Sequence, residues 1–368
     1  MANTSSPSFQ FVTLTLLILP AATIFLYFLT VFPHNPDTIT VHPSLSTLSN
    51  DTRSWQIYPA NFYEGGEYVT FPCGRVRYWL LGPPDGEKVR QHVSIAHAFP
   101  DTTYDVLQVV LIHGLSVPSI IWQDIAPQLV AKGFRVLLYD LYGRGYSDAP
   151  QVTYDTSLYV TQLALLFQYI RWDKANVVGV SMGGAIAAAF SDQFPHLTTG
   201  RLALLASAGI MEPKDMSRTS KFLASPLMQI VTSSYPFRLY LRHLANNSSM
   251  IDDPISELVR IQSAHLPGYN IAIASSIRDG PLRGLAPTFA SVGRRTRKEG
   301  GRVLLIWGTR DPVVPYRYAE RVQALIPQAE LVTLEGAKHD ITLSHPEEVG
   351  RRLIDFLQDD RPLETSAP

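Results

Sequence analysis

The chain is poor in cysteine and in net charge, and each shortage excludes or disfavours some kinds of site or partner. Among 368 residues there is one cysteine, Cys73, so an intramolecular disulfide and a cysteine-based metal site are excluded. We expect Cys73 to be a small core residue and not a reactive thiol. The formal net charge is −1, which argues against a nucleic-acid partner, because phosphate binding needs a basic surface. No internal repeat is visible.

Charge is missing altogether from residues 9–31, FQFVTLTLLILPAATIFLYFLTV. About twenty apolar residues suffice to cross a bilayer, and transmembrane helices tolerate a proline such as Pro20. The alternative is a cleaved signal peptide, whose apolar region is about 7–15 residues long and ends in small residues. This run is longer and ends in bulky residues. We therefore expect a single-pass membrane anchor over residues 9–32, in the endoplasmic reticulum or another endomembrane, with its orientation left open.

Apolar residues are plentiful, at 46% of the chain against 17% charged, so a large core can be buried. After a stretch at 33–66 that is rich in Pro, Ser, Thr and Asn, apolar runs alternate with helical patterns. This alternation indicates an α/β fold with a mostly parallel, eight-stranded sheet and helices on both faces. The expected strands are 67–71, 76–81, 107–112, 134–139, 176–180, 201–206, 303–307 and 330–334. The expected helices between them are 122–132, 157–170, 182–194, 316–325 and 346–357.

The alternation breaks between about Gly209 and Pro287, where helical segments are expected at 221–233, 236–244 and 255–264. Ligands of open α/β sheets bind outside the carboxyl ends of the strands, so an insertion at that end forms a lid. The predicted organisation is a tail at 1–8, the anchor at 9–32, a linker at 33–66, an α/β core at 67–208 and 288–360, a helical cap at 209–287 within that core, and a tail at 361–368.

One short stretch, VVGVSMGGAIAAAF at residues 177–190, places Ser181 between Gly179 and Gly183. A strand that turns sharply into a helix holds the residue at the turn in strained backbone, and glycines two positions to either side relieve the crowding. This is the G-x-S-x-G pattern of a nucleophile elbow. A glycine-rich turn with an incidental serine is the alternative that this pattern alone leaves open.

A serine hydroxyl needs a neighbouring base to act as a nucleophile, usually a histidine held by a carboxylate. Asp311 follows one late strand in GTRDPVVP, and His339 follows the last strand in EGAKHD. The order Ser181, Asp311, His339 is the one expected for this architecture. An oxyanion hole also needs backbone donors, and we assign the N–H groups of Met182 and of Leu115 in HGLSVP to that role.

Several further polar residues receive structural interpretations. We expect His113 to shape the loop that contains Leu115, and not to serve as a second base. Asp140, Gly143 and Gly145 in YDLYGRGYSD are interpreted as residues that form turns. The basic stretch GRRTRKEGGR, residues 293–302, is interpreted as a solvated loop.

Five motifs occur together and in order: VLLIHG, YDLYGRGYSDAP, VVGVSMGGAIA, LLIWGTRDPVVP and EGAKHDITLSHPEEV. Together they resemble the α/β-hydrolase superfamily over residues 67–358, and within it the capped serine esterase and lipase branch that includes membrane-anchored monoacylglycerol lipases. The resemblance implies an α/β-hydrolase fold that needs no metal or organic cofactor. It also implies a nucleophile, base, acid and two oxyanion donors at Ser181, His339, Asp311, Leu115 and Met182.

The predicted function is therefore a serine hydrolase that cleaves a carboxylic ester of a hydrophobic substrate, either a lipid such as a monoacylglycerol or a small apolar ester, through an acyl-enzyme on Ser181. The alternatives are a C–C bond hydrolase or an acyltransferase with the same triad, and then a non-catalytic binding protein on this scaffold. One residue departs from the family pattern: Lys338 precedes His339 where glycine is frequent, and a neighbouring cation disfavours an imidazolium. The membrane is the other expected partner, and the oligomeric state is left open.

Overall fold

The computed structural model describes residues 18, 20–25, 39–84, 88–90, 103–105, 107–216, 218–225, 228, 231, 234–247 and 251–358. The chain divides into residues 1–40 and residues 41–368. Most of the expected anchor, 9–32, lies outside the described residues, and its described positions are helical. In the described portions of the chain, no helix is long and apolar enough to cross a bilayer. The anchor therefore rests on the sequence alone.

The core is a mostly parallel sheet of eight strands, in the spatial order β2-β3-β7-β6-β9-β10-β11-β12. Neighbours from β7 to β12 run parallel, whereas β3 is antiparallel to both β2 and β7. All eight strands predicted from the sequence are confirmed, each to within three residues. Their bounds are β2 (Gly66–Phe71), β3 (Gly74–Leu81), β6 (Gln108–Ile112), β7 (Arg135–Tyr139), β9 (Ala175–Val180), β10 (Thr198–Leu205), β11 (Arg302–Gly308) and β12 (Glu330–Leu334).

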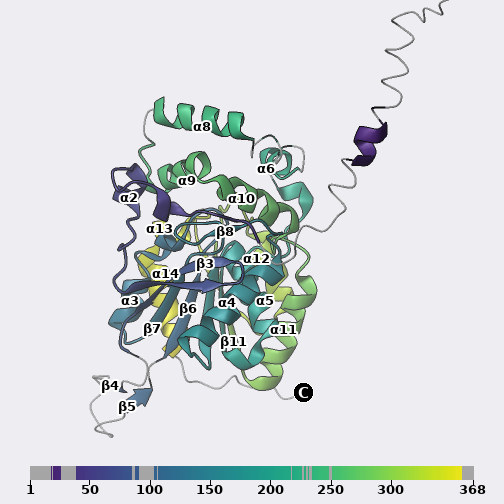
Figure 1. Cartoon of the computed structure of the whole chain (residues 1–368). Helices are drawn as coiled ribbons and strands as arrows, with labels where there is room; N and C mark the ends of the chain where they lie inside the picture. The colour runs from purple at the N-terminus through teal and green to yellow at the C-terminus, as the bar shows by residue number, and fades with distance from the viewer. Residues whose placement is uncertain are drawn as a thin grey trace, which may run out of the picture. The chain divides into compact units, whose positions relative to one another are not determined.

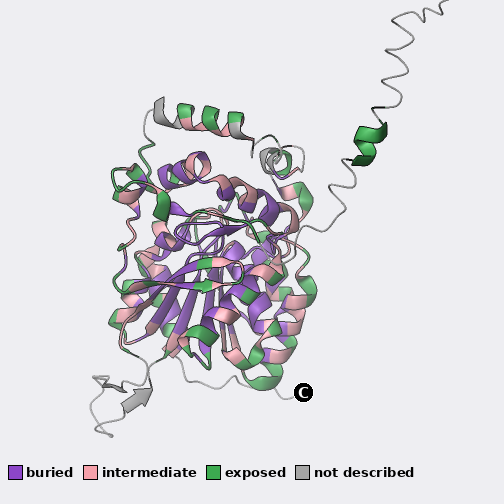
Figure 2. Cartoon of the chain, in the orientation of Figure 1, coloured by how far each residue is buried: buried purple, intermediate pink, exposed green. Residues whose placement is uncertain are grey.

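The central strands β6, β7, β9 and β11 are apolar and buried almost from end to end, because helices cover the sheet on both faces (Figure 2). Two groups of helices provide this cover: α3 contacts α14, while α4, α5, α11 and α12 contact one another in a row. The bounds are α3 (Ala126–Ala131), α4 (Thr156–Ile170), α5 (Met182–Gln193), α11 (Ala286–Glu299), α12 (Arg317–Leu325), α13 (Ile341–Ser344) and α14 (Pro346–Gln358), with a 3₁₀ turn at Ser119–Trp122 before α3.

The basic stretch 293–302 is not a loop, which corrects the sequence interpretation. Its first seven residues form the C-terminal half of α11, and its last residue begins β11. The sequence pattern was misinterpreted because charged residues outnumber the few residues that follow the helical periodicity. Phe289, Val292 and Thr296 are buried at the spacings of three and four that are typical of a helix. The charged side chains belong to the outer face of that helix.

The segment 33–66 is not a linker from residue 41 onward. Tyr58 and Tyr63 are buried in the core, and the Tyr63 hydroxyl donates to the Ser119 carbonyl oxygen over 3.0 Å. The prediction of a linker was based on the many small polar residues of the segment, whereas its packing depends on its aromatic residues. Its elements are β1 (Val41–His42), which pairs with β8 (Ala149–Pro150), a 3₁₀ turn (Leu45–Thr47) and α2 (Arg53–Ile57). A separate hairpin pairs β4 (Lys88–Arg90) with β5 (Thr103–Asp105).

Between β10 and β11 the chain leaves the sheet and forms a group of helices at one end of it, the cap (Figure 1). The two ends of this segment are joined by backbone hydrogen bonds: Gly209 N–H donates to Leu282 over 3.0 Å, and Leu285 N–H donates to Gly209 over 2.9 Å. The cap helices are α6 (Arg218–Leu223), α8 (Tyr235–Asn247), α9 (Pro254–His265) and α10 (Pro267–Asp279), preceded by a 3₁₀ turn (Pro213–Asp215). The sequence analysis did not anticipate α10, since its sequence contains glycine, asparagine, serine and three isoleucines, which are weak helix formers.

Candidate active site

Ser181 occupies the turn between β9 and α5 with φ 56° and ψ −121°, a conformation that non-glycine residues rarely adopt. The surrounding backbone holds it there. Its N–H donates to the Leu205 carbonyl over 2.8 Å, and its carbonyl accepts from the Ala208 N–H over 2.9 Å. Both partners lie at the end of β10, so the neighbouring strand fixes the strained turn.

Two glycines make this turn sterically possible. A Cβ atom on Gly179 would lie 2.1 Å from the Gly183 carbonyl oxygen, and a Cβ atom on Gly183 would lie 2.2 Å from the Ile112 carbonyl oxygen. Neither contact can be relieved by a side-chain movement, because both partners are backbone atoms. The glycines on either side of the serine are therefore required by the close approach of β9, α5 and the end of β6.

Three side chains from three different loops meet in a hydrogen-bonded row. The His339 Nε2 atom lies 2.9 Å from the Ser181 Oγ atom, and His339 Nδ1 lies 2.7 Å from Asp311 Oδ2. Asp311 is fully buried at its side chain, and its second oxygen accepts the N–H groups of Val313 and Val314, each over 2.8 Å. The structure thus brings together all three residues predicted as a triad, with the carboxylate fixed by its own loop.

The loops that carry the aspartate and the histidine are tied to each other. Thr309 N–H donates to the Leu334 carbonyl over 3.1 Å, and Arg310 N–H donates to the Ala337 carbonyl over 3.0 Å. These bonds extend the pairing of β11 with β12 beyond the ends of the strands. They set the separation of the carboxylate and the imidazole before any substrate is present.

The predicted oxyanion donors border the same serine. A Cβ atom placed on Gly114 would be 3.3 Å from the Ser181 Cβ atom, so the loop after β6 packs directly against the nucleophile. Met182 is the first residue of α5, where a backbone N–H has no partner within the helix. Among the residues that the structure describes, no backbone acceptor engages the N–H of either Leu115 or Met182. Neither N–H group is therefore occupied by a backbone hydrogen bond in the described part of the chain.

His113 holds one of these donors in place. Its Nδ1 atom lies 2.9 Å from the Gly114 carbonyl oxygen, and that carbonyl belongs to the same planar peptide unit as the Leu115 N–H. Its Nε2 atom accepts the Leu141 N–H over 2.8 Å, so the proton is assigned to Nδ1. Burial lowers the pKa of His113 to about 3, which keeps the ring neutral. Its position agrees with a role in shaping the loop.

Asp140, which directly follows β7, fixes neighbouring loops through its carboxylate. Its carboxylate accepts the N–H groups of Ser119 and Tyr146, each over 2.9 Å, and the hydroxyl of Tyr58 over 3.2 Å. Burial raises the pKa of Asp140 to about 6. All of its partners are structural, which agrees with the interpretation of this motif as a turn.

A cavity of about 780 Å³ opens onto Ser181 and His339. One side, the core wall, is formed by the loops that carry the triad and the oxyanion donors. On the other side, residues of the cap line the cavity, and the cap wall is the name used here for its buried apolar members, Met211, Met216, Ile277 and Leu282. The described lining also contains three carboxylates, from Asp215, Asp253 and Asp340, and no lysine or arginine, and Asp215 is ion-paired with Arg317, which is not among the lining residues. The cavity is thus mostly apolar, with carboxylates in its lining.

Lys338 and a second hollow lie outside this arrangement. Lys338 is exposed and is not among the described residues that line the cavity, so solvent screens its charge.

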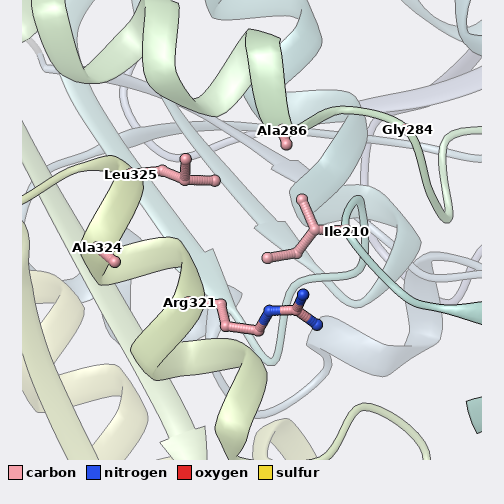
Figure 3. Close-up of a pocket in the computed structure, with 6 residues that line it drawn as sticks. All are labelled: Ile210, Gly284, Ala286, Arg321, Ala324 and Leu325. Atoms are coloured by element: carbon pink, nitrogen blue, oxygen red, sulfur yellow. The ribbon is translucent and has the colours of Figure 1, made fainter.

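A smaller hollow of about 380 Å³ lies where Ile210 and Arg321 face each other beside α12 (Figure 3). It contains none of the triad residues. Among the described residues, no cluster of His, Cys, Asp and Glu could hold a metal ion.

Two groups of residues could not be predicted from the sequence: those of the cap wall, and the cap residues that bond the loop after β6, called the oxyanion loop below because it contains Leu115. Tyr269 of α10 is one of these, since its hydroxyl donates to the Ser116 carbonyl over 2.9 Å. No local motif marks such a contact, because it joins residues that are far apart in the sequence. An apolar side chain in the cap carries no signal either until the fold shows which face it lines.

Comparison with known proteins places this geometry in a family. Residues 109–352 match the model of the alpha/beta hydrolase family. The chain is 27% identical to a 2-hydroxy-6-oxo-2,4-heptadienoate hydrolase of Pseudomonas putida, with 68% of this chain and 88% of that protein covered. It is 28% identical to a pimeloyl-[acyl-carrier protein] methyl ester esterase of Edwardsiella ictaluri, with 67% and 92% covered.

Solved structures show the same fold. An alpha/beta hydrolase enzyme from a Medee basin deep-sea metagenome library superposes with a TM-score of 0.61 at 15% identity, over 80% of this chain and 98% of that one. The family match spans the strands β6 to β12 and all three residues of the hydrogen-bonded row. The family match, together with the fold and the geometry of the site, shows that the chain belongs to the alpha/beta hydrolase family.

Proposed function

We propose that the protein is a serine hydrolase that cleaves carboxylic esters of uncharged, apolar substrates through an acyl-enzyme on Ser181. The observation that carries this proposal is the continuous hydrogen-bonded row from Ser181 through His339 to the buried Asp311, open to an apolar cavity. A serine so placed is activated by its base, and the base is oriented by the carboxylate.

In the acylation step, Ser181 Oγ attacks the acyl carbon while His339 Nε2 takes the hydroxyl proton. Asp311 stabilises the imidazolium that forms. The developing oxyanion accepts hydrogen bonds from the N–H groups of Leu115 and Met182, and each such donor contributes on the order of 10²–10³ in rate. His339 then gives its proton to the leaving alcohol, which departs.

In the second step, a water molecule attacks the acyl carbon of the ester on Ser181. His339 again acts as the base and takes the proton from that water. Collapse of the tetrahedral intermediate releases the acid and restores the serine hydroxyl. Each bond broken in one step is balanced by a bond formed, so no cofactor is required by this route.

The charge of the cavity supports an uncharged substrate. Several relatives are named as hydrolases of 2-hydroxy-6-oxo dienoates, which are carboxylates, whereas another is named as a methyl ester esterase. A carboxylate in this cavity would lie near Asp253 and Asp340, and near Asp215, whose charge is paired with Arg317, and no lysine or arginine is among the described lining residues. Like charges repel more strongly in a partly desolvated cavity than in water. We therefore favour an ester, with a monoacylglycerol-like lipid as one candidate, over C–C bond cleavage of a dienoate.

The first experiment is labelling with a fluorophosphonate probe, comparing the wild type with Ser181→Ala. Ser207→Ala is the matched control, since Ser207 is a buried serine after the adjacent strand β10 whose hydroxyl donates to the Ala208 carbonyl. We expect labelling of the wild type and the control, and none of Ser181→Ala. Folded wild type that does not react would contradict the proposal.

The second experiment tests substrate charge with a matched pair. p-Nitrophenyl hexanoate and mono-p-nitrophenyl adipate have acyl chains of the same length, and only the second ends in a carboxylate. We expect kcat/KM to favour the neutral ester by about tenfold or more. Equal rates, or turnover of a 2-hydroxy-6-oxo dienoate in preference to both esters, would contradict the assignment.

A further inference from the structure

Arg144 is an unusual charged residue in this molecule, because it is fully buried and has no carboxylate partner among the described residues. A buried charge is costly unless hydrogen bonds or counter-ions satisfy it. It lies in YDLYGRGYSD, at the seam where the loop after β7 meets the cap: a Cβ atom on the preceding Gly143 would be 2.4 Å from the Ala272 Cβ atom of α10. No role for Arg144 was predicted from the sequence.

The guanidinium is satisfied by neutral oxygens that come from separate parts of the fold. Nε donates to the Leu115 carbonyl over 2.9 Å. Nη1 donates to the Tyr142 carbonyl over 2.8 Å and to the Tyr159 hydroxyl of α4, and Nη2 donates to the Ser276 hydroxyl of α10 over 2.7 Å. A planar fork with fixed donor directions suits such a task better than a flexible ammonium group.

The contact with Leu115 bears directly on the oxyanion hole. His113 holds the Gly114 carbonyl, whose peptide unit contains the Leu115 N–H, and Arg144 holds the carbonyl of Leu115 itself. The backbone on both sides of the Leu115 α-carbon is therefore fixed. Because the φ and ψ angles of Leu115 couple the peptide unit that contains its N–H to the peptide unit that Arg144 holds, loss of either hold is expected to turn that donor away from the oxyanion.

The contact with Ser276 connects the same loop to the cap. The Ser276 hydroxyl lies 2.7 Å from the Tyr159 hydroxyl and donates to the Ala272 carbonyl over 2.6 Å, so it is fixed within α10. Tyr269, two helical turns earlier in α10, holds the next carbonyl of the loop, that of Ser116. One cap helix thus reaches two consecutive carbonyls of the oxyanion loop, one directly and one through Arg144.

We propose that Arg144 is a positioning residue of the oxyanion hole, which aligns the Leu115 N–H only while α10 of the cap is seated against the core. The inference rests on the proposed function, since it assumes that an oxyanion forms at this site. It predicts that loss of the Arg144 contacts weakens binding of the tetrahedral state more than binding of the substrate, because an oxyanion donor acts mainly in that state.

The test compares Arg144→Met, Arg144→Lys and Ser276→Ala with Ser275→Ala as the matched control. Ser275 is the neighbouring buried serine of α10, and its hydroxyl bonds Tyr154 and Asp279, not Arg144. The readouts are kcat and KM for p-nitrophenyl hexanoate, and the inhibition constant of an alkyl trifluoromethyl ketone. The ketone carbon takes up the serine oxygen and its carbonyl becomes an oxyanion, so its affinity reports the hole directly.

We expect Arg144→Met to lower kcat by about 100-fold with KM changed less than about threefold, and to raise the inhibition constant by a similar factor. Arg144→Lys recovers only part of this loss, since one ammonium cannot match the fork. Ser276→Ala lowers kcat by about fivefold, as for one hydrogen bond, with a parallel rise in the inhibition constant. Ser275→Ala leaves both constants within about twofold of the wild type.

The inference is overturned if Ser276→Ala behaves like Ser275→Ala, if Arg144→Lys retains the kcat of the wild type, or if the inhibition constant does not follow kcat. If Arg144→Met does not fold, as judged by circular dichroism, the other two variants decide. Wild type that neither hydrolyses the ester nor binds the ketone contradicts the proposed function itself. Active wild type with an unaffected Ser276→Ala variant contradicts only the role of Arg144.

Discussion

The two walls of the cavity differ in how tightly their structure is determined. The core wall contains a strained serine, glycines in contact with backbone atoms and a buried carboxylate with every oxygen bonded. The cap wall, Met211, Met216, Ile277 and Leu282, presents apolar side chains to the cavity, beside the carboxylates of Asp215 and Asp253 that the cap also contributes. The difference teaches that side-chain substitutions in the two walls should have effects of different size and kind, even though α10 of the cap also holds the loop that contains Leu115.

The largest effect expected on the core wall, other than removal of the nucleophile, is that of Asp311→Asn. The amide cannot stabilise the imidazolium and favours the wrong tautomer of His339, and the comparable change in a serine protease costs about 10⁴ in kcat. We expect a loss of that order, measured as kcat on p-nitrophenyl hexanoate. The exposed Asp173→Asn serves as the control. A loss of less than tenfold would mean that the carboxylate does not orient the base.

A smaller but still severe effect is expected from Gly179→Ala. The added Cβ atom would lie 2.1 Å from a backbone oxygen of the elbow helix, so β9 and α5 must separate, at a cost of about 3 kcal/mol. Gly336→Ala is the control, because Gly336 has φ +73° but nothing within 4 Å of a Cβ atom, and there the cost is about 1–2 kcal/mol. Urea unfolding of both variants measures the difference. Equal losses would show that the elbow is not tightly packed.

The core wall should also respond to pH through His113, whose pKa is lowered from 6.5 to about 3 in the folded protein. The stability that comes from keeping it neutral is complete above pH 6.5 and is lost as the pH falls toward 3. We therefore expect the advantage in unfolding free energy of the wild type over His113→Gln to shrink by about 1.4 kcal/mol per pH unit between pH 6.5 and 4.

Buried Asp140, with a raised pKa, acts in the opposite sense between its ordinary value and about pH 6. For that reason the wild type alone is not informative, and the difference between the two proteins is the quantity to measure by urea unfolding at several pH values. A difference that does not change with pH would mean that the folded protein tolerates a charged ring at position 113.

The smallest effect is expected on the cap wall, from Ile277→Ala. Removing this side chain enlarges the cavity and should shift the preference among p-nitrophenyl esters toward longer acyl chains by about threefold, with kcat on short esters unchanged. Phe222→Ala is the control, since Phe222 belongs to the cap but is 59% exposed and does not line the cavity. A change in kcat on all esters alike would show that the two walls are not independent.

The same division explains what the sequence could reveal. Each strand of the sheet is a short apolar run, and each residue of the row follows its own strand, so local patterns located Ser181, Asp311 and His339. The cap follows such patterns only in part: the helices expected at 236–244 and 255–264 correspond to α8 and α9, whereas α10 contains many weak helix formers and is held in place by contacts with distant residues. The helix at 286–299 was missed because charged residues dominate its outer face.

Long-range hydrogen bonds were likewise beyond the reach of sequence reasoning. Arg144 was quoted within a turn motif, but nothing in its neighbours along the chain states that it bonds Leu115 and Ser276, which lie 29 and 132 positions away. The burial of Tyr58 and Tyr63 could not be predicted either, because they lie in a segment whose composition is typical of a linker. In both cases the tertiary structure, and not the local propensity, gives the residue its role.

The hydrogen bonds that join Gly209 to Leu282 and Leu285 have a consequence for how such proteins diversify. The cap begins and ends at neighbouring positions, which these backbone hydrogen bonds hold together without using any side chain of the cap. A recombination event at these two positions would exchange the cap wall as a block, and it would keep the contacts of the cap with the loop of Leu115 only if the new cap supplied counterparts of Tyr269 and Ser276. The same two positions are where hybrid enzymes with inherited chemistry and new selectivity can be assembled in the laboratory.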